Sequence, residues 1–320
     1  MNSVFAFASA RWPCSGWAIR ILEEMSVTIL MTGATGEIGR RVVARLVRAG
    51  APVRAMSRRP GEAVRVLPDG VNVVPGDLAE PGSLREALRG AERLYLFPVA
   101  ATAKEVVGMA VAAGVRRIVT LSSGAVEGGY DTDFHLPVEQ AVEASGVEWT
   151  HVRPGEFMLN KLWLWGPSIR AEGVVRDPFP EASWCPVHED DIADVATAAL
   201  LEDGHAGRAY MLNGPEFLTH RQQVALIGDA VGEAVGRVRF EQVTPERARE
   251  IYRAQGGFAA ANADFLLGFE SYSGGTAEPE DRAQIDLSAG GPLPTAREAI
   301  GRPARTFEKW ARDHAADFRT

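Results

Sequence analysis

Lysine is scarce in this chain of 320 residues: Lys104, Lys161 and Lys309 are the only lysines among its 34 basic residues. Cysteine occurs only as Cys14 and Cys185, which excludes a disulfide framework or a zinc site built from cysteines and favours a reducing compartment. The 34 basic and 42 acidic residues give a net charge of -8. A nucleic-acid-binding surface needs clustered positive charge, so we expect no nucleic-acid partner. No apolar run reaches the roughly 18 residues of a membrane span, so we expect a cytoplasmic protein without membrane contact.

The first 24 residues differ in pattern from the rest of the chain. They begin with a short apolar stretch and have no basic residue before Arg11, whereas a secretory signal begins with positive charge. We therefore expect residues 1–24 to be a disordered tail, or an artefact of the chosen start site, because Met25 opens a clean strand. A mitochondrial leader is the alternative, since Arg11 and Arg20 precede any acidic residue.

From residue 26 onward, strand patterns alternate with helical patterns. The run VTILMT at 27–32 is continuously apolar, as expected for a parallel strand buried on both faces. The apolar residues that follow share one helical face, before Gly50 ends the helix: Ile38, Val42, Val43, Leu46 and Val47. Further strands are predicted at 52–57, 71–76, 93–98, 117–123, 147–153 and 208–213, and helices at 83–89, 102–113, 134–145 and about 189–202. This alternation predicts an α/β fold with a doubly wound parallel sheet.

The regular rhythm loosens after residue 153. Proline and glycine gather at 166–180, and the glycine-rich stretches 256–275 and 288–296 predict loops. The last helix has apolar residues at helical spacing, which favours core packing over a functional aromatic group: Phe307, Trp310, Ala311 and Phe318.

These patterns predict two regions in addition to the tail. Residues 25–155 are expected to form the sheet domain, to which residues 184–213 return. Residues 156–183 and 214–320 are expected to form a smaller, substrate-binding region.

A glycine-rich loop, TGATGEIG at 32–39, joins the first strand to the first helix. Gly33 allows the tight turn, Gly36 allows a pyrophosphate to approach the backbone, and Gly39 allows the helix to pack on the strand. A glycine triplet alone is a weak signal, but the preceding strand and following helix supply the context of a dinucleotide site. A purely structural tight turn is the alternative. The remaining loop residues expected to contact the cofactor are Thr35, Glu37 and Ile38.

The second strand ends in Ser57-Arg58-Arg59. An NAD site places a carboxylate here for the ribose 2′-hydroxyl, whereas arginines suit a 2′-phosphate, so the sequence predicts a preference for NADP(H). Two solvated arginines are the alternative. Asp77 and Leu78 follow the third strand, where Asp77 is equally suited to accept from the adenine amino group or to cap a helix.

At this point the sequence resembles the NmrA-like atypical short-chain dehydrogenase/reductases. The resembling segments are TGATGEIG (32–39), SRR (57–59), GDL (76–78), AGVRRIVTLSS (113–123), EQAVEASGVEWTHVRPGEFMLN (139–160) and VHEDDIADVA (187–196). The resemblance covers about residues 26–215. It implies a Rossmann-type NAD(P)-binding domain and a small C-terminal substrate-binding region. Members include NADPH-dependent reductases of quinones, dyes and enones, and redox sensors without known turnover.

The ordinary superfamily pair Tyr-x-x-x-Lys is absent. In that pair the tyrosine donates a proton, while the lysine lowers its pKa and holds the ribose. None of the five tyrosines has a lysine four positions on. Alignment on Glu139 and the Ser145-Gly146 pair places His135 in the lysine position. Asp131 then takes the tyrosine position, with Tyr130 one residue away.

A histidine at position 135 resembles the quinone- and dye-reducing branch of the family. His135 is expected to contact the nicotinamide ribose or to donate a proton, with a capping or surface histidine as the alternative. Ser122 and Ser123 end the fifth strand, where they either reach the nicotinamide or the substrate or simply form a turn. The candidate catalytic residues are therefore His135, Ser123 and Tyr130.

Other residues are placed around the same site. Phe97 and Pro98 end the fourth strand, and the resemblance implies that Pro154 and Gly155 run beside the nicotinamide. The expected pocket for a flat, apolar ring is lined by Phe157, Asn160, Trp163 and Trp165. Core packing is the alternative for one tryptophan. The cluster His188-Glu189-Asp190-Asp191 precedes an apolar helix, which favours helix capping over a metal site.

These residues together predict a reductase, acting as a monomer or homodimer and without a metal. It is expected to pass a hydride from NADPH to a quinone, an enone or another conjugated carbonyl. Such substrates delocalise the incoming charge, so they tolerate the missing tyrosine and lysine. The alternative is a regulatory protein that senses NADP(H) without turnover.

Overall fold

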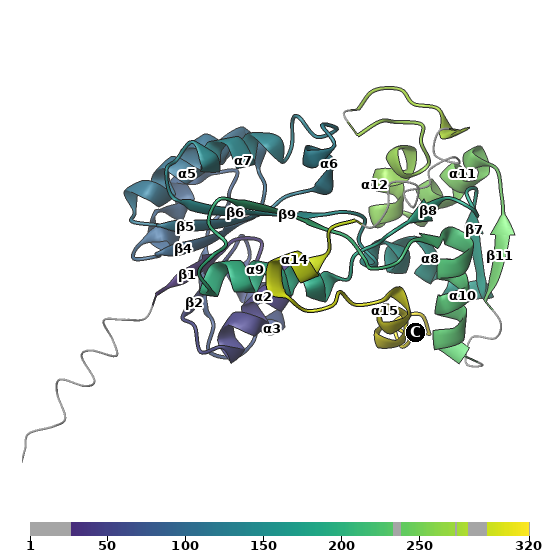
Figure 1. Ribbon diagram of the computed structural model, residues 1–320, viewed down its shortest axis with the longest axis horizontal. Coiled ribbons are helices and arrows are strands. Elements are labelled where there is room, and N and C mark those ends of the chain that lie inside the picture. Colours follow the sequence, from purple (N-terminus) through teal and green to yellow (C-terminus); the bar gives the residue numbers. More distant parts are fainter. Residues whose placement is uncertain (1–26, 233–237, 273, 281–292, 320) are drawn as a thin grey trace, which may run out of the picture.

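A seven-stranded parallel sheet forms the centre of the computed structural model, which describes residues 27–232, 238–272, 274–280 and 293–319 (Figure 1). The strand order is β3-β2-β1-β4-β5-β6-β9. The strands are β1 (Ile29–Met31), β2 (Val53–Ser57), β3 (Asn72–Pro75), β4 (Arg93–Leu96), β5 (Arg117–Leu121), β6 (Glu148–Pro154) and β9 (Arg208–Leu212). The predicted α/β class with a doubly wound sheet is confirmed, whereas residues 1–24 lie outside the described part.

Helices cover both faces of this sheet (Figure 1). One face carries α2 (Glu37–Arg48), α9 (Glu189–Leu201) and α14 (Ala296–Ile300), and the other carries α4 (Arg85–Leu88), α5 (Ala103–Ala112) and α7 (Leu136–Glu143). Successive side chains of β1 alternate between them: Ile29 and Met31 enter the α2 side, and Leu30 enters the α5 side. This double burial explains why the strand reads as a continuous apolar run.

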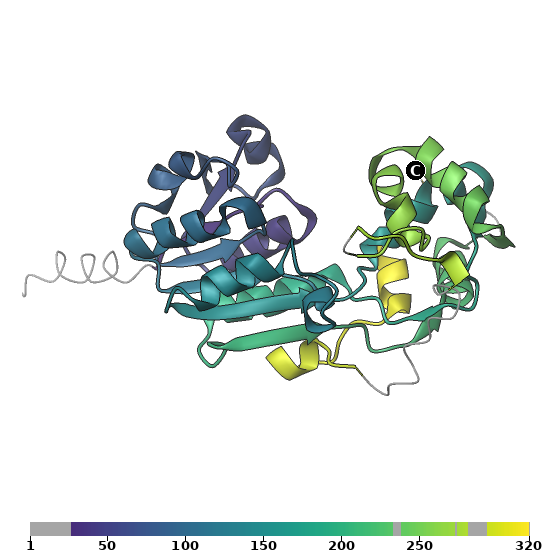
Figure 2. The ribbon, with the colours of Figure 1, turned by 90° about the horizontal axis from the view of Figure 1, so that it is seen from above.

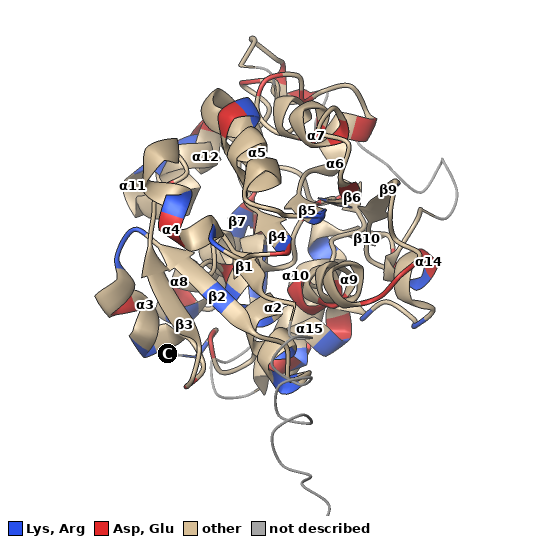
Figure 3. Ribbon diagram, turned by 90° about the vertical axis from the view of Figure 1, so that its left-hand side faces the viewer, with Lys and Arg blue, Asp and Glu red and all other residues tan. Residues whose placement is uncertain are grey.

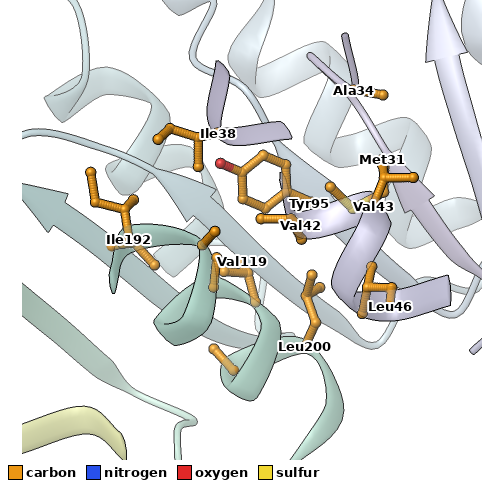
Figure 4. Packing of buried hydrophobic residues seen from close by; sticks show 14 of the residues in the cluster. Met31, Ala34, Ile38, Val42, Val43, Leu46, Tyr95, Val119, Ile192 and Leu200 are labelled. Atoms are coloured by element: carbon orange, nitrogen blue, oxygen red, sulfur yellow. The ribbon is translucent and has the colours of Figure 1, made fainter. Parts of the chain in front are cut away.

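Tyr95 on β4 belongs to the core on the α2 side. Figure 4 shows its ring among Ile38, Val42 and Val43 of α2. Burial raises the pKa of the Tyr95 phenol, and its hydroxyl has no hydrogen-bond partner among the described residues. Tyr95 is thus a packing residue, and its hydroxyl is closed off from solvent.

Beside the sheet lies a group of helices and short strands (Figure 2), which contains a second hydrophobic cluster. Its elements are α8 (Leu159–Glu172), β7 (Val174–Asp177), β8 (Ser183–Trp184), β10 (Leu218–Thr219), α10 (His220–Val231), β11 (Arg239–Gln242), α11 (Pro245–Gln255), α12 (Gly257–Leu266) and α15 (Phe307–Asp313). Strands β7 and β11 pair in parallel, and β8 and β10 pair antiparallel. The predicted core role is confirmed for the aromatic and small residues of the last helix: Phe307, Trp310, Ala311 and Phe318.

The segment 256–275, expected to be a loop, contains helix α12. Gly256 and Gly257 both have positive φ, at 76° and 55°, and they separate α11 from α12. The alanine-rich sequence that follows favours a helix, so these glycines mark a break between helices. Of the other predicted loop, residues 288–292 lie outside the described part, and α14 begins at Ala296. This helix packs against the core on the α2 side of the sheet, away from the second cluster.

Helix α8 also differs from the expected irregular stretch at 166–180, because it continues through Gly166 and Pro167. Proline lacks the N–H that would donate to the carbonyl four residues earlier, which belongs to Trp163. Gln255 compensates, since its Nε2 donates to the Trp163 carbonyl at 2.6 Å.

Two short helices join consecutive strands beside the sheet. Helix α3 (Pro60–Val66) joins β2 to β3 and has no counterpart among the predicted elements. It buries Ala63 and leaves Val64 and Val66 exposed, so it lacks the apolar stripe by which a helix is read from sequence. Helix α6 (Gly124–Glu127) follows β5, and 3-10 turns span Pro81–Leu84 and Ala100–Thr102.

The acidic start of α9 serves as a helix terminus and as an ion-pair partner. His188 is the N-cap, and its Nδ1 accepts from the Asp190 N–H at 3.1 Å. Glu189 pairs with Arg41 at 3.1 Å, and Asp190 pairs with Arg45 at 2.8 Å. This agrees with the capping interpretation. Figure 3 shows acidic and basic segments interspersed at the end of the molecule that it faces.

His314 joins the end of the chain to the start of α9. Its Nε2 lies 2.7 Å from Glu189 Oε1, and its Nδ1 lies 2.7 Å from Asp317 Oδ2. Burial by itself lowers the pKa of His314, but the hydrogen bonds to the two carboxylates outweigh burial and raise it above its ordinary value. In the described part of the chain, no helix is long and apolar enough to cross a bilayer.

We expect His314→Gln to lower the free energy of unfolding at acidic pH by about 1–2 kcal/mol, allowing for solvent screening. Because the folded pKa is raised, this contribution is complete below the unfolded value of about 6.5 and disappears as the pH rises through the folded value. Urea unfolding of both proteins at about pH 5.5 and pH 8.5 checks this dependence. A difference between the proteins that is equal at both pH values would contradict it.

Candidate active site

The glycine loop lies where β1 ends and α2 begins. Gly33 has φ +58°, and a Cβ on Gly39 would lie 2.1 Å from the Gly33 carbonyl oxygen, so both positions require glycine. The N-cap of α2 is Gly36, and it supplies no side-chain cap. The helix therefore presents its first backbone N–H groups without a capping side chain, which fits a pyrophosphate.

The side chains of the next loop residues are used elsewhere. Ile38 is buried in the core (Figure 4), and Glu37 pairs with Arg40 and Arg41. Any cofactor contact from Glu37 or Ile38 is therefore expected through the backbone. Thr35 is exposed at the loop.

Phe97 lies against the glycine turn from the end of β4. Its ring is 3.1 Å from the place that a Cβ on Gly33 would take, and 41% of the residue is exposed. The Phe97 N–H donates to Thr32 Oγ1 at 2.8 Å, which ties the ends of β1 and β4 together. Pro98 is buried behind it. The Phe97 ring therefore forms one boundary of the space beside the glycine turn.

The two arginines after β2 differ in their partners. Arg59 pairs with Glu62 at 3.1 Å, whereas the exposed Arg58 has no ion pair among the described residues. Asp77 Oδ1 accepts from the Ala79 N–H at 3.0 Å and so holds its own turn, as the capping alternative anticipated. Leu78 is buried. Arg58 is thus the freer of the two cations at the adenosine end.

Ser122 is placed differently from the prediction. Its side chain is buried, and Oγ donates to Glu139 Oε1 at 2.5 Å, so the hydroxyl points into the interior. Arg153 Nη2 holds the other oxygen of Glu139 at 2.7 Å. Burial alone raises the pKa of Glu139, but these donors outweigh it and lower the pKa. The network fixes the end of β5 beside β6.

Ser123 is the N-cap of α6, and its hydroxyl stays half-buried at the sheet edge. Nearby, His135 Nδ1 lies 2.5 Å from Asp131 Oδ2. Asp131 also accepts from the backbone N–H groups of Phe134 and His135, each at 3.0 Å. Burial by itself raises the pKa of Asp131, but these hydrogen bonds outweigh burial and lower it. His135 is the N-cap residue of α7, yet its ring caps nothing and pairs with Asp131 instead.

Tyr130 does not belong to this group, although it was predicted as a catalytic candidate. The residue is 68% exposed and follows the short helix α6, where its backbone N–H donates to Ala125. A different tyrosine takes part. The Tyr272 hydroxyl lies 3.1 Å from Asp131 Oδ2 and 3.5 Å from Ser123 Oγ.

The turn after β6 lies close to β9. The Gly155 N–H donates to the Leu212 carbonyl at 2.9 Å, and a Cβ on Gly155 would meet Asn213 Oδ1 at 2.7 Å. Gly155 thus has no room for a side chain, while the preceding Pro154 is buried at the end of β6. The turn brings the chain from the sheet into α8.

The four predicted pocket residues separate into two groups. Phe157, Asn160 and Trp163 are half-buried, and Trp163 packs on Phe258 with ring centroids 5.0 Å apart. Trp165 is only 1% exposed and belongs to the second hydrophobic cluster. The prediction of Trp165 as a pocket wall is therefore replaced by core packing, because its position on α8 turns the indole inward.

The carboxyl ends of β1, β4, β5 and β6 thus carry the glycine loop, Phe97, Ser123 and Gly155 on neighbouring parallel strands. Ligands of doubly wound sheets bind at this edge. A sequence model described as NAD(P)H-binding matches residues 33–203. The chain belongs to this NAD(P)H-binding family.

Two relatives and one solved structure resemble most of the chain. The (4-alkanoyl-5-oxo-2,5-dihydrofuran-3-yl)methyl phosphate reductase of Streptomyces griseus is 41% identical over 297 residues, covering 91% of this chain and 99% of the relative. An NAD(P)H azoreductase of Xenophilus azovorans is 33% identical over 302 residues, covering 91% and 99%. The triphenylmethane reductase of Citrobacter sp., complexed with NADP(H), has a TM-score of 0.71 at 21% identity, covering 90% and 99%.

The predicted family resemblance is confirmed as far as the NAD(P)H-binding family, and an NmrA structure shares the fold, with a TM-score of 0.63 at 21% identity and coverage of 90% of this chain and 95% of that one. The family member described here is an NAD(P)H-dependent oxidoreductase, since its relatives are named reductases. The NADP(H)-sensing alternative is accordingly less favoured than turnover.

Sequence reasoning missed two features of this family member. Tyr272 comes from a segment expected to be a loop, and no local pattern links it to Asp131. The other feature is Lys161, which is 1% exposed and donates to Glu156 Oε1 at 2.7 Å. A buried lysine needs a partner, and an acidic residue five positions before one of only three lysines was an available signal.

Proposed function

We propose that this oxidoreductase prefers NADPH and reduces a conjugated carbonyl, such as an enone or a quinone. The observation that carries the proposal is the group formed by Ser123, Asp131, His135 and Tyr272 at the carboxyl end of β5. It lies on the edge that also carries the glycine loop. Polar donors at that edge suit a substrate oxygen on which charge develops.

The residues present fit the cofactor. The uncapped start of α2 would hold the pyrophosphate, Arg58 the 2′-phosphate and His135 the nicotinamide ribose. The reduced nicotinamide, when bound, supplies the hydride. Phe97 and the half-buried Phe157 and Trp163 would exclude water from a flat ring.

The relatives support the substrate class. The name of the Streptomyces griseus relative describes a ring in which the carbon–carbon double bond is conjugated with carbonyl groups. The other relative is named for azo reduction, and the solved structure for triphenylmethane reduction. These compounds share a conjugated, electron-accepting system, which lowers the demand for a strong acid.

Oxidation of NADPH by the purified protein against a panel of enones and quinones tests the proposal. We expect turnover with several conjugated carbonyls and slower turnover with saturated ketones, which cannot delocalise the charge. Saturated ketones reduced as fast as the enones would contradict the substrate class. NADPH left unoxidised by the whole panel would contradict the function.

We expect His135→Ala to lower turnover, and cofactor titration assigns its role. Ribose contact predicts weaker NADPH binding, whereas proton donation predicts unchanged binding with a lower maximal rate. His135→Asn is the matched variant, because its amide can still donate to Asp131. Full activity of His135→Ala would show that His135 has no role in turnover.

A further inference from the structure

Tyr272 reaches the sheet edge from the C-terminal part of the chain. It lies in a turn closed by an antiparallel bridge between Glu270 and Thr276 and by a 2.7 Å bond from the Ser271 N–H to the Gly275 carbonyl. The Phe265 ring at the end of α12 meets the Tyr272 ring edge-on, with centroids 5.5 Å apart. These contacts within the C-terminal part of the chain hold the Tyr272 ring in place.

The hydroxyl of Tyr272 faces three polar groups that belong to the segment between β5 and α7. It lies 3.1 Å from Asp131 Oδ2, 3.5 Å from Ser123 Oγ and 3.5 Å from His135 Nδ1. A carboxylate only accepts, so the phenol donates to Asp131. Asp131 thereby accepts a hydrogen bond from the phenol in addition to those from two backbone N–H groups and the His135 ring.

The other four tyrosines are placed elsewhere, and all five lie within the described residues. Tyr95 and Tyr252 are core residues, and the Tyr210 hydroxyl bonds to His205 Nδ1 at 2.9 Å. Tyr130 is largely exposed. Tyr272 is 37% exposed, so the residue is partly open to solvent while its hydroxyl contacts the polar group.

Tyr272 thus brings a phenol next to the two positions at which the superfamily pair Tyr-x-x-x-Lys would stand. Residues 131 and 135 are four apart on one stretch of chain, and they carry Asp and His. Burial and the Asp131 carboxylate raise the pKa of Tyr272, although its hydrogen bond with Ser123 opposes them. The phenol therefore keeps its proton at neutral pH.

We propose that Tyr272 is the proton donor to the carbonyl oxygen of the substrate and that Asp131 and Ser123 position its hydroxyl. This inference rests on the proposed function. When the hydride forms a new C–H bond on the substrate, the conjugated π electrons move to the carbonyl oxygen. The Tyr272 O–H turns from Asp131 to that oxygen and breaks as the oxygen takes its proton, and the resulting phenolate regains a proton from solvent water.

The matched pair Tyr272→Phe and Tyr130→Phe tests this role. Each variant loses one hydroxyl and keeps its ring, and only Tyr272 contacts the polar group. With cyclohexenone and NADPH, we expect Tyr272→Phe to lower kcat about 100-fold or more, the effect typical of losing a positioned acid. Tyr130→Phe should retain most of its turnover. The loss should be smaller with menadione, because a quinone delocalises the charge better.

A structural contact would give a different result. If the hydroxyl only joins the two parts of the chain, Tyr272→Phe should lower the melting temperature or weaken NADPH binding while kcat stays near that of the wild type. That result would overturn the inference, and so would an equal loss in both variants. An unchanged NADPH affinity and a kcat loss with little change in KM would support it.

A binding experiment distinguishes failure of this inference from failure of the proposed function. If the wild type oxidises NADPH with no compound of the panel, menadione is titrated into the protein saturated with NADP+. A hydrogen bond from Tyr272 to the carbonyl predicts binding about fivefold or more weaker in Tyr272→Phe than in Tyr130→Phe. Equal binding by the two variants, or no binding by the wild type, would overturn the inference.

Discussion

Replacement of Arg58 and Arg59 by alanine should weaken NADPH binding by a factor of about 100 or more and leave NADH binding nearly unchanged. Charge-assisted bonds to a phosphate are worth roughly 1.5–3 kcal/mol each, and only NADPH carries the 2′-phosphate. Arg58 should account for most of the loss, because Arg59 is already paired with Glu62 at 3.1 Å. Calorimetric titration of both cofactors at one ionic strength measures the difference.

Arg65→Ala is the control for this experiment. Arg65 is an exposed arginine of α3 beyond the end of β2, so its removal changes the net charge by as much as the removal of Arg58 alone, without touching the proposed phosphate contact. We expect it to alter the affinity for NADPH and NADH by similar, small factors. Equal losses of NADPH and NADH binding in the Arg58 and Arg59 variants would show that neither arginine recognises the 2′-phosphate.

The sheet and the cofactor loop could be predicted from sequence because their signals are local. Strand β1 is apolar at each of its residues, Ile29–Met31, since its side chains enter the core on both faces of the sheet. Gly33 and Gly39 are required by one tight turn within eight residues. The predicted right-handed crossovers make the strands parallel, so their carboxyl ends lie at one edge of the sheet.

The misplaced elements are those in which local signals conflict with packing. Gly256 and Gly257 predicted a loop, although they only separate two helices. Pro167 predicted an irregular segment, but Gln255 from another helix supplies the hydrogen bond that the helix lost. Such compensation comes from residues distant in sequence, so no local pattern shows it.

The candidate site divides in the same way. Asp131 and His135 are four positions apart, and alignment on the residues after them sufficed to single them out. Tyr272 lies 137 residues beyond His135, and Trp165 faces the core although Trp163, two positions before it, is half-buried. Both placements depend on how the C-terminal region packs, which a search for Tyr-x-x-x-Lys does not address.

The pair formed by the buried Lys161 and the half-buried Glu156 carries the largest expected effect on stability. Lys161 Nζ also lies 4.7 Å from the centre of the Trp165 ring. The nearby Asp177 is buried, and although burial raises its pKa, His220 and Lys161 outweigh burial and lower it. Removal of the ammonium would therefore leave Glu156 without its cation, whereas Asp177 would keep its hydrogen bonds with His220 and the Phe179 N–H.

We expect Lys161→Met to lower the free energy of unfolding by about 3–5 kcal/mol, the cost of leaving a buried charge unpaired. Lys309→Met is the matched control, since Lys309 forms an exposed pair with Asp313 at 2.8 Å and should cost less than about 1 kcal/mol. The double change of Lys161→Met with Glu156→Gln should recover part of the loss, because it removes both charges of the pair. Denaturant unfolding of the four proteins compares these values. A Lys161→Met protein as stable as the Lys309→Met control would show that the ammonium does not compensate the Glu156 carboxylate.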